Sequence, residues 1–190
     1  MKYTRIKNVE QQLFVQAWNL YKESFPPVER RHLQSQKNIM NNPLYHFELI
    51  TDENMFIGFI MWWSFKNVRY IEHLAIFLRL QGNGYGTRIL NDFISKSDIP
   101  VLLEVEHPEN MRDIRRIDFY KRVGFVLNTH PYKHPPYKKG GEYVSLMLMT
   151  YPQAITNEEL TRFIEEYHPI IHRFVLAGRP VKKRHILKQN

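Results

Sequence analysis

The sequence predicts an α/β fold: a single mixed, mostly antiparallel sheet of about seven strands with helices on both faces, followed by a C-terminal helical extension. Strand-like runs follow one another closely in the first half of the chain, which favours an antiparallel meander. Between residues 68 and 106 a strand, a helix and a strand alternate, which favours a right-handed crossover between parallel strands. Hydrophobic residues fill 43% of the 190 positions, enough for a packed core rather than a disordered chain.

The N-terminal half supplies the first four strands and two helices. A short strand is expected at 3–7, and the apolar residues of 9–22 recur at helical spacing. Pro26 and Pro27 end that helix because a proline ring does not continue it, and a second, polar helix is expected at 28–40. Three strands joined by short turns follow, at 45–51, 55–65 and 68–77.

The second half carries the crossover and then two more strands. The segment 84–96 has one apolar helical face, and a break at Pro100 leads into a strand at 101–106. Apolar residues at a spacing of three predict the next helix at 111–123. The last strands are expected on either side of a loop rich in proline, tyrosine, lysine and glycine, at 124–129 and 142–150.

The chain divides into a domain at 1–150 and a helical extension with a basic tail at 151–190. Asn157 is the expected N-cap of the helix in this extension. Five basic residues and no acidic one lie between Gly178 and Asn190, so the tail supplies five of the eight net positive charges. Both a nucleic-acid-binding arm and a solvated tail fit this pattern. The solvated tail is favoured, because the rest of the chain is only weakly basic.

The composition excludes several classes of protein. Cysteine is absent, which excludes disulfides, thiolate metal sites and a cysteine nucleophile. The apolar stretch Met55 to Phe65 is about half of the roughly 20 residues that cross a bilayer. The first residues carry charge with no apolar run behind it, unlike a secretory signal. We therefore expect a soluble, cytoplasmic protein that works as a monomer or homodimer.

A metal site is not expected, although some histidines have a spacing that suits one. His168 and His172 lie four residues apart on the predicted C-terminal helix. A zinc peptidase would need a glutamate directly after the first histidine, and Pro169 stands there. A carboxylate di-iron site would need a second Glu-x-x-His motif on another helix.

A glycine-rich segment from Gln81 to Thr87 joins a predicted strand to a predicted helix. Its three glycines allow a tight turn and a close approach of the backbone to a ligand. The helix that follows begins with unpaired N–H groups, so the segment suits a phosphate or pyrophosphate. A Rossmann loop fits less well, since it reads G-x-G-x-x-G and follows the first strand of a parallel sheet. A P-loop needs a Gly-Lys-Ser/Thr tripeptide, which the chain lacks.

Two motifs together resemble the GNAT superfamily of acetyl-CoA-dependent N-acetyltransferases. The first is Gln81-x-x-Gly84-x-Gly86, which matches the family's Q/R-x-x-G-x-G/A signature between a strand and a helix. The second is Tyr120-x-x-x-Gly124-Phe125, one helix and one strand further on. The resemblance covers residues 3 to 150, and the predicted order of elements is also that of the family.

The resemblance implies where acetyl-CoA binds. Its pyrophosphate would lie on the backbone N–H groups of the glycine-rich segment, and its pantetheine arm where the strands at 68–77 and 101–106 separate. Asp113 stands where the family often has asparagine, and Asn110 is its possible substitute. The implied cofactor-binding residues are Leu74, Ala75, Ile76, Gln81, Gly82, Asn83, Gly84, Tyr85, Gly86, Thr87, Asn110 and Asp113.

The same resemblance suggests catalytic groups. Tyr120 is implied as the general acid that protonates the departing thiolate. A general base must deprotonate the amine, because an amine with a lysine-like pKa is almost wholly protonated at pH 7. Glu72 is the favoured base, since regular alternation places it on one strand face with Leu74 and Ile76, and places His73 on the other. The reserve candidates are Glu104 and Glu106.

Two proline-rich loops are expected to frame the acceptor, at 24–31 and 134–142. Glu29 and Tyr137 are the expected acceptor contacts. The basic residues of these loops would favour an acceptor that carries a phosphate or carboxylate, although they would equally suit the cofactor or solvent. The basic residues concerned are Arg30, Arg31, Lys138 and Lys139.

The favoured function is therefore acetyl transfer from acetyl-CoA to a primary amine of a small molecule or peptide. Two other classes stay open. A non-catalytic acyl-CoA-binding module would use the same scaffold without a base and an acid. A nucleic-acid-binding protein would use the basic tail, and its affinity would fall steeply with salt.

Overall fold

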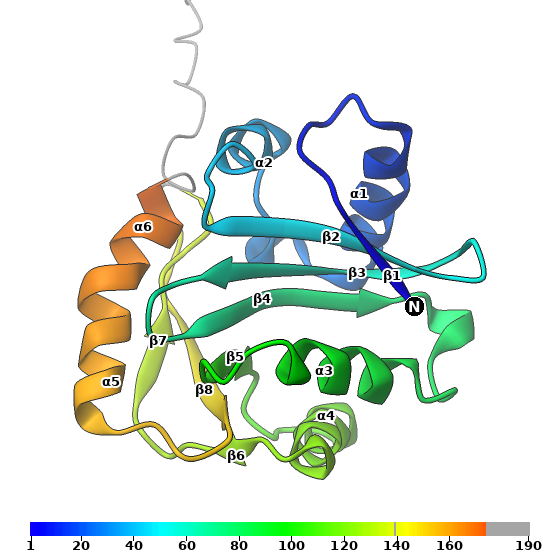
Figure 1. Cartoon of the computed structure of the whole chain (residues 1–190). Coiled ribbons are helices and arrows are strands. Elements are labelled where there is room, and N and C mark those ends of the chain that lie inside the picture. The colour runs from blue at the N-terminus through cyan, green and yellow to red at the C-terminus, as the bar shows by residue number, and fades with distance from the viewer. Residues whose placement is uncertain (139, 174–190) are drawn as a thin grey trace, which may run out of the picture.

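The computed structural model describes residues 1–138 and 140–173, and its centre is one eight-stranded sheet (Figure 1). The strand order is β1-β2-β3-β4-β5-β8-β6, with β7 paired to β8. Neighbouring strands of the described chain are antiparallel, except that β4 and β5 are parallel. The strands are β1 (Lys2–Arg5), β2 (Tyr45–Asp52), β3 (Met55–Ser64), β4 (Arg69–Ile76), β5 (Val101–Val105), β6 (Val126–Leu127), β7 (Tyr132–His134) and β8 (Val144–Tyr151).

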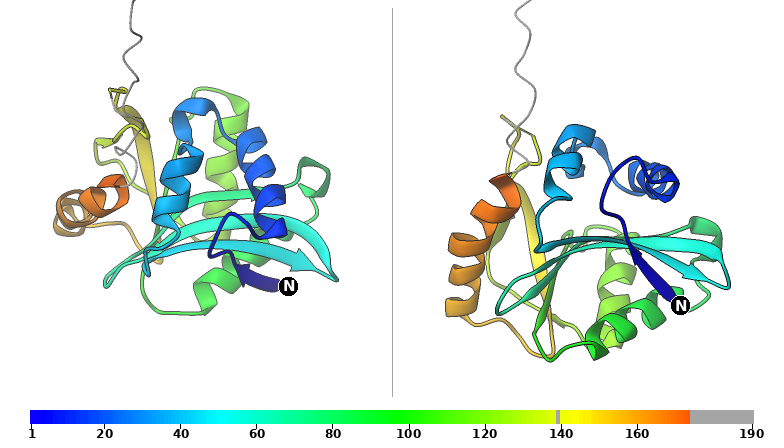
Figure 2. Two further views of the ribbon diagram at one scale, coloured as in Figure 1. Left: turned by 90° about the horizontal axis from the view of Figure 1, so that it is seen from above. Right: turned by 45° about the horizontal axis from the view of Figure 1, so that its top comes forward.

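Helices cover both faces of this sheet, so the hydrophobic core forms two layers, one on each side of the sheet (Figure 2). One layer lies under α1 (Gln12–Ser24) and α2 (Leu33–Ile39), and the other under α3 (Tyr85–Ser95) and α4 (Met111–Val123). Phe163 and Tyr167 of the C-terminal helix pack in the same core layer as α1. It consists of α5 (Asn157–Arg162), the π-helical turn η3 (Phe163–Tyr167) and α6 (His168–Arg173). In the described part of the chain no helix has both the length and the apolar character of a membrane span.

The predicted fold class and the parallel crossover are confirmed, and the differences are local. The helix expected at 28–40 is shorter, because the prolines start a 3₁₀ turn, η1 (Pro27–Glu29), before α2. The strand β7 was not predicted, because three residues between prolines are too short to show alternation. Thr156 rather than Asn157 is the N-cap of α5: its hydroxyl accepts from the Glu159 N–H, and the Glu159 carboxylate accepts from the Thr156 N–H. The tail at 178–190 lies outside the described residues.

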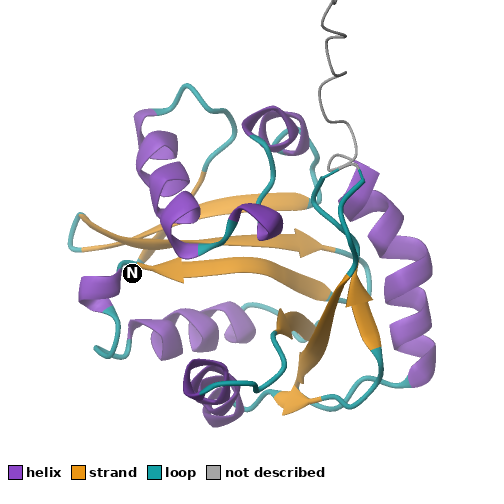
Figure 3. Cartoon of the chain, turned by 180° about the vertical axis from the view of Figure 1, so that it is seen from behind, coloured by secondary structure: helices purple, strands orange, loops and turns teal. Residues whose placement is uncertain are grey.

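The central parallel pair separates after three residues. Arg69–Ile71 of β4 pairs with Val101–Leu103 of β5, and the pairing ends there. In Figure 3, β8 runs steeply across the direction of β3 and β4, so the two halves of the sheet diverge beyond this point. The separation that the family resemblance implied is therefore present, and it leaves backbone groups of both strands available to a ligand.

A β-bulge in β4 lies where the strands separate. Trp62 of β3 pairs with Ile71, and the next β3 residue in the ladder, Met61, pairs with His73. Glu72 is therefore an extra residue without a partner in β3. The bulge changes the alternation of side chains along β4 and places Glu72 and His73 on the same face.

Candidate active site

A cleft of about 410 Å³ lies on the α3 and α4 side of the separated strands. The backbone between β4 and α3 forms one wall, including the short 3₁₀ turn η2 (Leu78–Leu80). The other wall is aromatic and basic, and it comes from α4. The lining residues include Leu74, Ile76, Gln81, Gly82, Gly84, Tyr85, Gly86, Thr87, Arg116, Phe119, Tyr120 and Arg122.

The glycine-rich segment has a backbone conformation in which a residue other than glycine would be strained at two positions. Gly82 and Gly84 have φ values of +81° and +76°, in the left-handed region that favours glycine. Gly84 is also the N-cap of α3, so the N–H groups of the first helical turn lie at the cleft without helical partners. Gln81 holds the segment against β4, because its side-chain amide donates to the Ile76 carbonyl at 3.0 Å. Free donors and the positive helix end together fit a phosphate-bearing ligand.

Tyr120 lines the cleft near the end of α4, and the motif around it is a helix end. Gly124 caps α4 with a φ of +103°, and the Phe125 N–H donates to the Tyr120 carbonyl at 3.0 Å. Phe125 is buried in the core and packs against the Tyr120 ring. The glycine and phenylalanine thus fix the last turn of α4, and with it the tyrosine. Burial raises the pKa of Tyr120 to about 12, so the phenol keeps its proton at neutral pH.

A second, smaller pocket of about 90 Å³ lies beyond the separated strands, on the side of α1 and the C-terminal helix. Arg116 lines both this pocket and the cleft, so the two cavities meet at that side chain. Four carboxylic acids line the pocket. They are Glu29, Glu72, Glu104 and Glu106, and the other lining residues include Phe25, His73, His134, Tyr137 and Leu146.

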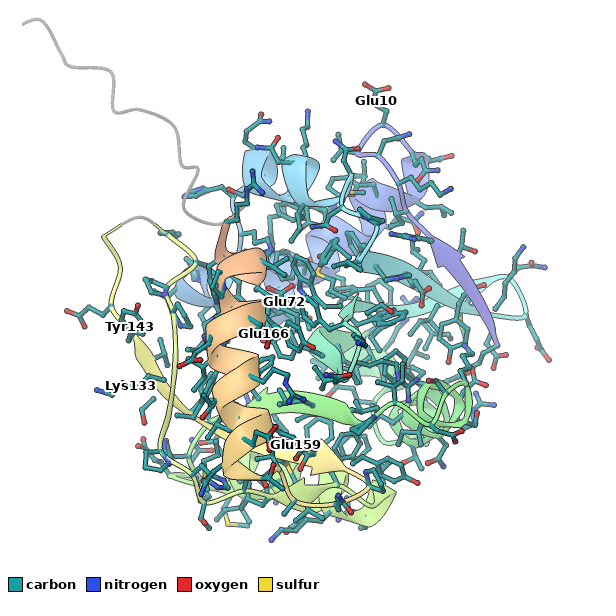
Figure 4. The ribbon with its side chains drawn as sticks, turned by 60° about the vertical axis from the view of Figure 1, so that its left-hand side comes forward. Glu10, Glu72, Lys133, Tyr143, Glu159 and Glu166 are labelled. Atoms are coloured by element: carbon teal, nitrogen blue, oxygen red, sulfur yellow. The ribbon has the colours of Figure 1, made fainter. Side chains whose placement is uncertain are left out.

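The Glu72 side chain is completely buried, and three donors bind its carboxylate. It forms an ion pair with Arg31 and accepts from Trp63 Nε1 at 3.1 Å and from Tyr137 Oη at 3.0 Å. Figure 4 shows it inside the body of the molecule, whereas Lys133 and Tyr143 project outward. The expectation that Glu72 shares a face with Leu74 and Ile76 is wrong, because the bulge turns it to the opposite face together with His73.

A second buried network lies next to it. The Glu104 carboxylate accepts from Tyr132 Oη and from His134 Nδ1. Since the Tyr132 hydroxyl gives its one proton to Glu104, His168 Nε2 donates to the Tyr132 oxygen, 2.8 Å away. Burial lowers the pKa of His168 to about 4, which agrees with a neutral ring that carries its proton on Nε2. The C-terminal helix therefore helps to hold a wall of the pocket.

Several expected contacts lie elsewhere. Ala75 is buried on the face opposite the cleft and packs with the core of α1. The Asn83 amide donates to the Leu80 carbonyl at 3.4 Å. Asn110 caps α4 and donates to the Asp113 carboxylate at 2.6 Å, so the two side chains are hydrogen-bonded to each other. A role of these four residues in cofactor binding stays a prediction.

None of the described basic residues of the two loops, Arg30, Arg31 and Lys138, lines the pocket. The Arg31 guanidinium is buried against Glu72, and Arg30 donates to the Lys22 carbonyl at 2.8 Å. Lys139 lies outside the described residues. Glu29 and Tyr137 do line the pocket, as expected. The role of Arg116 was not predicted, because nothing in the sequence distinguishes it from the other arginines of α4.

The comparisons with known proteins agree with this geometry. Residues 14–125 match the model of the acetyltransferase (GNAT) family. A putative acetyltransferase from the GNAT family of Bacteroides thetaiotaomicron is 32% identical, with a TM-score of 0.81 over 94% of this chain and 100% of the other. No curated protein is significantly similar in sequence.

More distant structures share the fold alone. An aminoglycoside 6'-N-acetyltransferase complexed with coenzyme A is 15% identical, with a TM-score of 0.55 over 79% of this chain and 96% of the other. A chimera of the spermidine N-acetyltransferase from Vibrio cholerae is also 15% identical, with a TM-score of 0.58 over 85% and 100% of the two chains. The family match and the 32% identical structure define an acyltransferase. The chain belongs to the GNAT family of acetyltransferases.

Proposed function

We propose that the protein transfers an acetyl group from acetyl-CoA directly to a primary amine of a small molecule or peptide. One observation carries this proposal. The parallel strands separate after three paired residues, and a cleft with phosphate-binding features meets a carboxylate-lined pocket at Arg116. A donor on one side and an acceptor on the other would bring their reacting atoms together at this junction.

The donor would lie in the cleft. The free N–H groups at the start of α3 would bind its pyrophosphate, and the unpaired backbone of β4 near Leu74 and Ile76 would bind the amides of its pantetheine arm. Arg122 adds positive charge along the opposite wall, where Arg116 forms an ion pair with Glu106. This arrangement uses the backbone for most contacts, so it depends little on which side chains surround it.

The reaction requires that protons leave the nitrogen of the acceptor amine and that one proton reaches the sulfur of coenzyme A. The amine loses a proton, attacks the thioester carbon and loses a second proton, while the C–S bond breaks and the thiolate takes up one. Tyr120 would supply the proton of the thiol, since its phenol is protonated at neutral pH and lines the cleft. Backbone N–H groups near Leu74 would stabilise the oxyanion. One proton is released to solvent in each turnover.

The pocket favours a cationic acceptor. Of the four carboxylic acids that line it, Glu72, Glu104 and Glu106 have basic partners, whereas Glu29 has none among the described residues and would be the one to attract an ammonium group. The pocket volume of about 90 Å³ suits the end of an unbranched chain better than a ring system. We therefore infer that the acceptor presents its amine on a slender arm, as an alkylamine, a lysine side chain or a polyamine does.

A free-thiol assay with acetyl-CoA tests the proposal. The panel would contain n-butylamine, lysine, spermidine and a tripeptide, with calorimetry of coenzyme A binding alongside. We expect coenzyme A to bind and at least one amine to stimulate thiol release. Binding without transfer to any amine would favour the acyl-CoA-binding module instead. Failure to bind coenzyme A would contradict both.

A further inference from the structure

The four carboxylates of the acceptor pocket differ in what already holds them. Glu72 has three donors, Glu104 has two and Glu106 has Arg116. Among the described residues, no hydrogen bond or ion pair engages the Glu29 carboxylate. A carboxylate that donors already stabilise in its charged form is a weaker base. We infer that Glu29, rather than Glu72, accepts the proton of the amine, an inference that rests on the proposed function.

The turn that carries Glu29 is well fixed. It lies at the end of η1, which two prolines precede and begin, and the Glu29 N–H donates to the Pro26 carbonyl at 3.0 Å. Its own carbonyl is 3.0 Å from His73 Nε2. Burial lowers the pKa of His73 to about 4, so its ring is neutral and donates through Nε2. The backbone of Glu29 is thus fastened to β4, beside the point where the strands separate.

The charges around Glu29 suit a base. Burial raises the pKa of its carboxyl group and Glu106 raises it further, while Arg116, Arg112 and His134 oppose this without reversing it. Three of these four neighbours line the same pocket. The charged and titratable groups that face Glu29 from the surrounding elements are Glu106 after β5, Arg112 and Arg116 on α4, His134 on β7 and His73 on β4.

In the proposed reaction the amine nitrogen loses two protons, one to Glu29 and one to Tyr120. The ammonium group of the acceptor gives one N–H proton to a Glu29 carboxylate oxygen, which leaves a neutral amine with a lone pair. That lone pair attacks the thioester carbon, and the C–S bond breaks as Tyr120 protonates the sulfur. Glu29 then releases its proton to solvent, and Tyr120 regains one from the nitrogen of the product. No oxidant, reductant or metal takes part.

The variant Glu29→Gln tests this inference, with Glu23→Gln as the matched control on exposed α1 surface. With an amine that the wild type acetylates, we expect kcat of Glu29→Gln to fall about 100-fold with little change in KM, because general bases contribute roughly that factor or more. The ratio of the wild-type rate to the Glu29→Gln rate should decrease as the pH falls through the pKa of Glu29. The titration of the amine cancels in that ratio.

Chemical rescue gives a readout that a structural role would not change. Sodium formate should restore part of the activity of Glu29→Ala but not that of Tyr120→Phe. Three results would each overturn the inference: a kcat of Glu29→Gln within threefold of wild type, a loss confined to KM, or a rate ratio that does not depend on pH. A wild type that binds coenzyme A but acetylates no amine would instead remove the proposed function, and this inference with it.

Discussion

The two cavities that meet at Arg116 are built in different ways. The cleft takes one wall from a single stretch of chain, residues 74–87, and the glycines of that stretch make the wall mostly from backbone. The acceptor pocket takes side chains from η1, β4, β5, β7 and β8, which are far apart in sequence. Behind it lie buried ion pairs and histidines. The proposed donor site is thus built mostly from local backbone, and the proposed acceptor site from side chains that are far apart in sequence.

Three of the carboxylates that line the acceptor pocket have hydrogen-bond or ion-pair partners, and Glu29 has none among the described residues. If Glu72 has the structural role that its contacts indicate, Glu72→Gln should lower the free energy of unfolding by about 3–5 kcal/mol, because Arg31 stays buried without its counter-ion. Glu29→Gln should change it by less than about 1 kcal/mol, because Glu29 is only partly buried. Urea unfolding measures both. A Glu72→Gln variant as stable as wild type but inactive would restore Glu72 as the base.

The acceptor side should also be the acid-sensitive side. His168 has a pKa of about 4 in the folded protein, because it is buried, and about 6.5 when unfolded. Below pH 6.5 the unfolded chain therefore takes up a proton that the folded protein does not, and stability declines until about pH 4. His168→Gln should remove about 2 kcal/mol of the decline between pH 7 and pH 5. Urea unfolding of His32→Gln, an exposed histidine, should show the full decline.

The α4 wall of the cleft carries Tyr120, the one side chain there to which the proposed reaction assigns a chemical step. Tyr120→Phe should lower turnover at least about tenfold, a barrier increase of about 1.4 kcal/mol, because the thiolate loses its proton donor. The ring keeps its contacts with Phe119 and Phe125, so thermal unfolding should change little. Steady-state thiol release with the accepted amine is the measurement. An unchanged rate would assign Tyr120 to packing alone.

The smallest expected effect is on stability, and it comes from replacing a glycine of the cleft wall. Gly84→Ala and Gly140→Ala should each cost about 1 kcal/mol, because both positions have positive φ with no neighbouring atoms in the way. Of these two glycines, only Gly84 lines the cleft. Calorimetry should therefore show weaker coenzyme A binding for Gly84→Ala and wild-type binding for Gly140→Ala. Equal binding by both variants would mean that the ligand does not use the backbone at α3.

The sequence was most informative where structure is local. It predicted α4 at 111–123, the crossover from β4 to β5 and the glycine-rich start of α3, because periodicity, prolines and glycines act within a few residues. It also predicted Glu29 and Tyr137 as pocket residues from their proline-rich loops. It did not predict β7 or the partners of Glu72, since those depend on segments up to 65 residues apart.

By itself the sequence determined most of the elements, their order and the glycine-rich turn before α3, because short-range sterics and hydrogen bonding fix these features. Only the tertiary structure decided which acidic residue of the pocket has partners and which has none among the described residues. One extra residue in β4 turns Glu72 towards Arg31 and Tyr137, and the packing of α6 brings His168 to the Tyr132 hydroxyl. Regular alternation does not reveal such a bulge, because its position depends on how two strands pair.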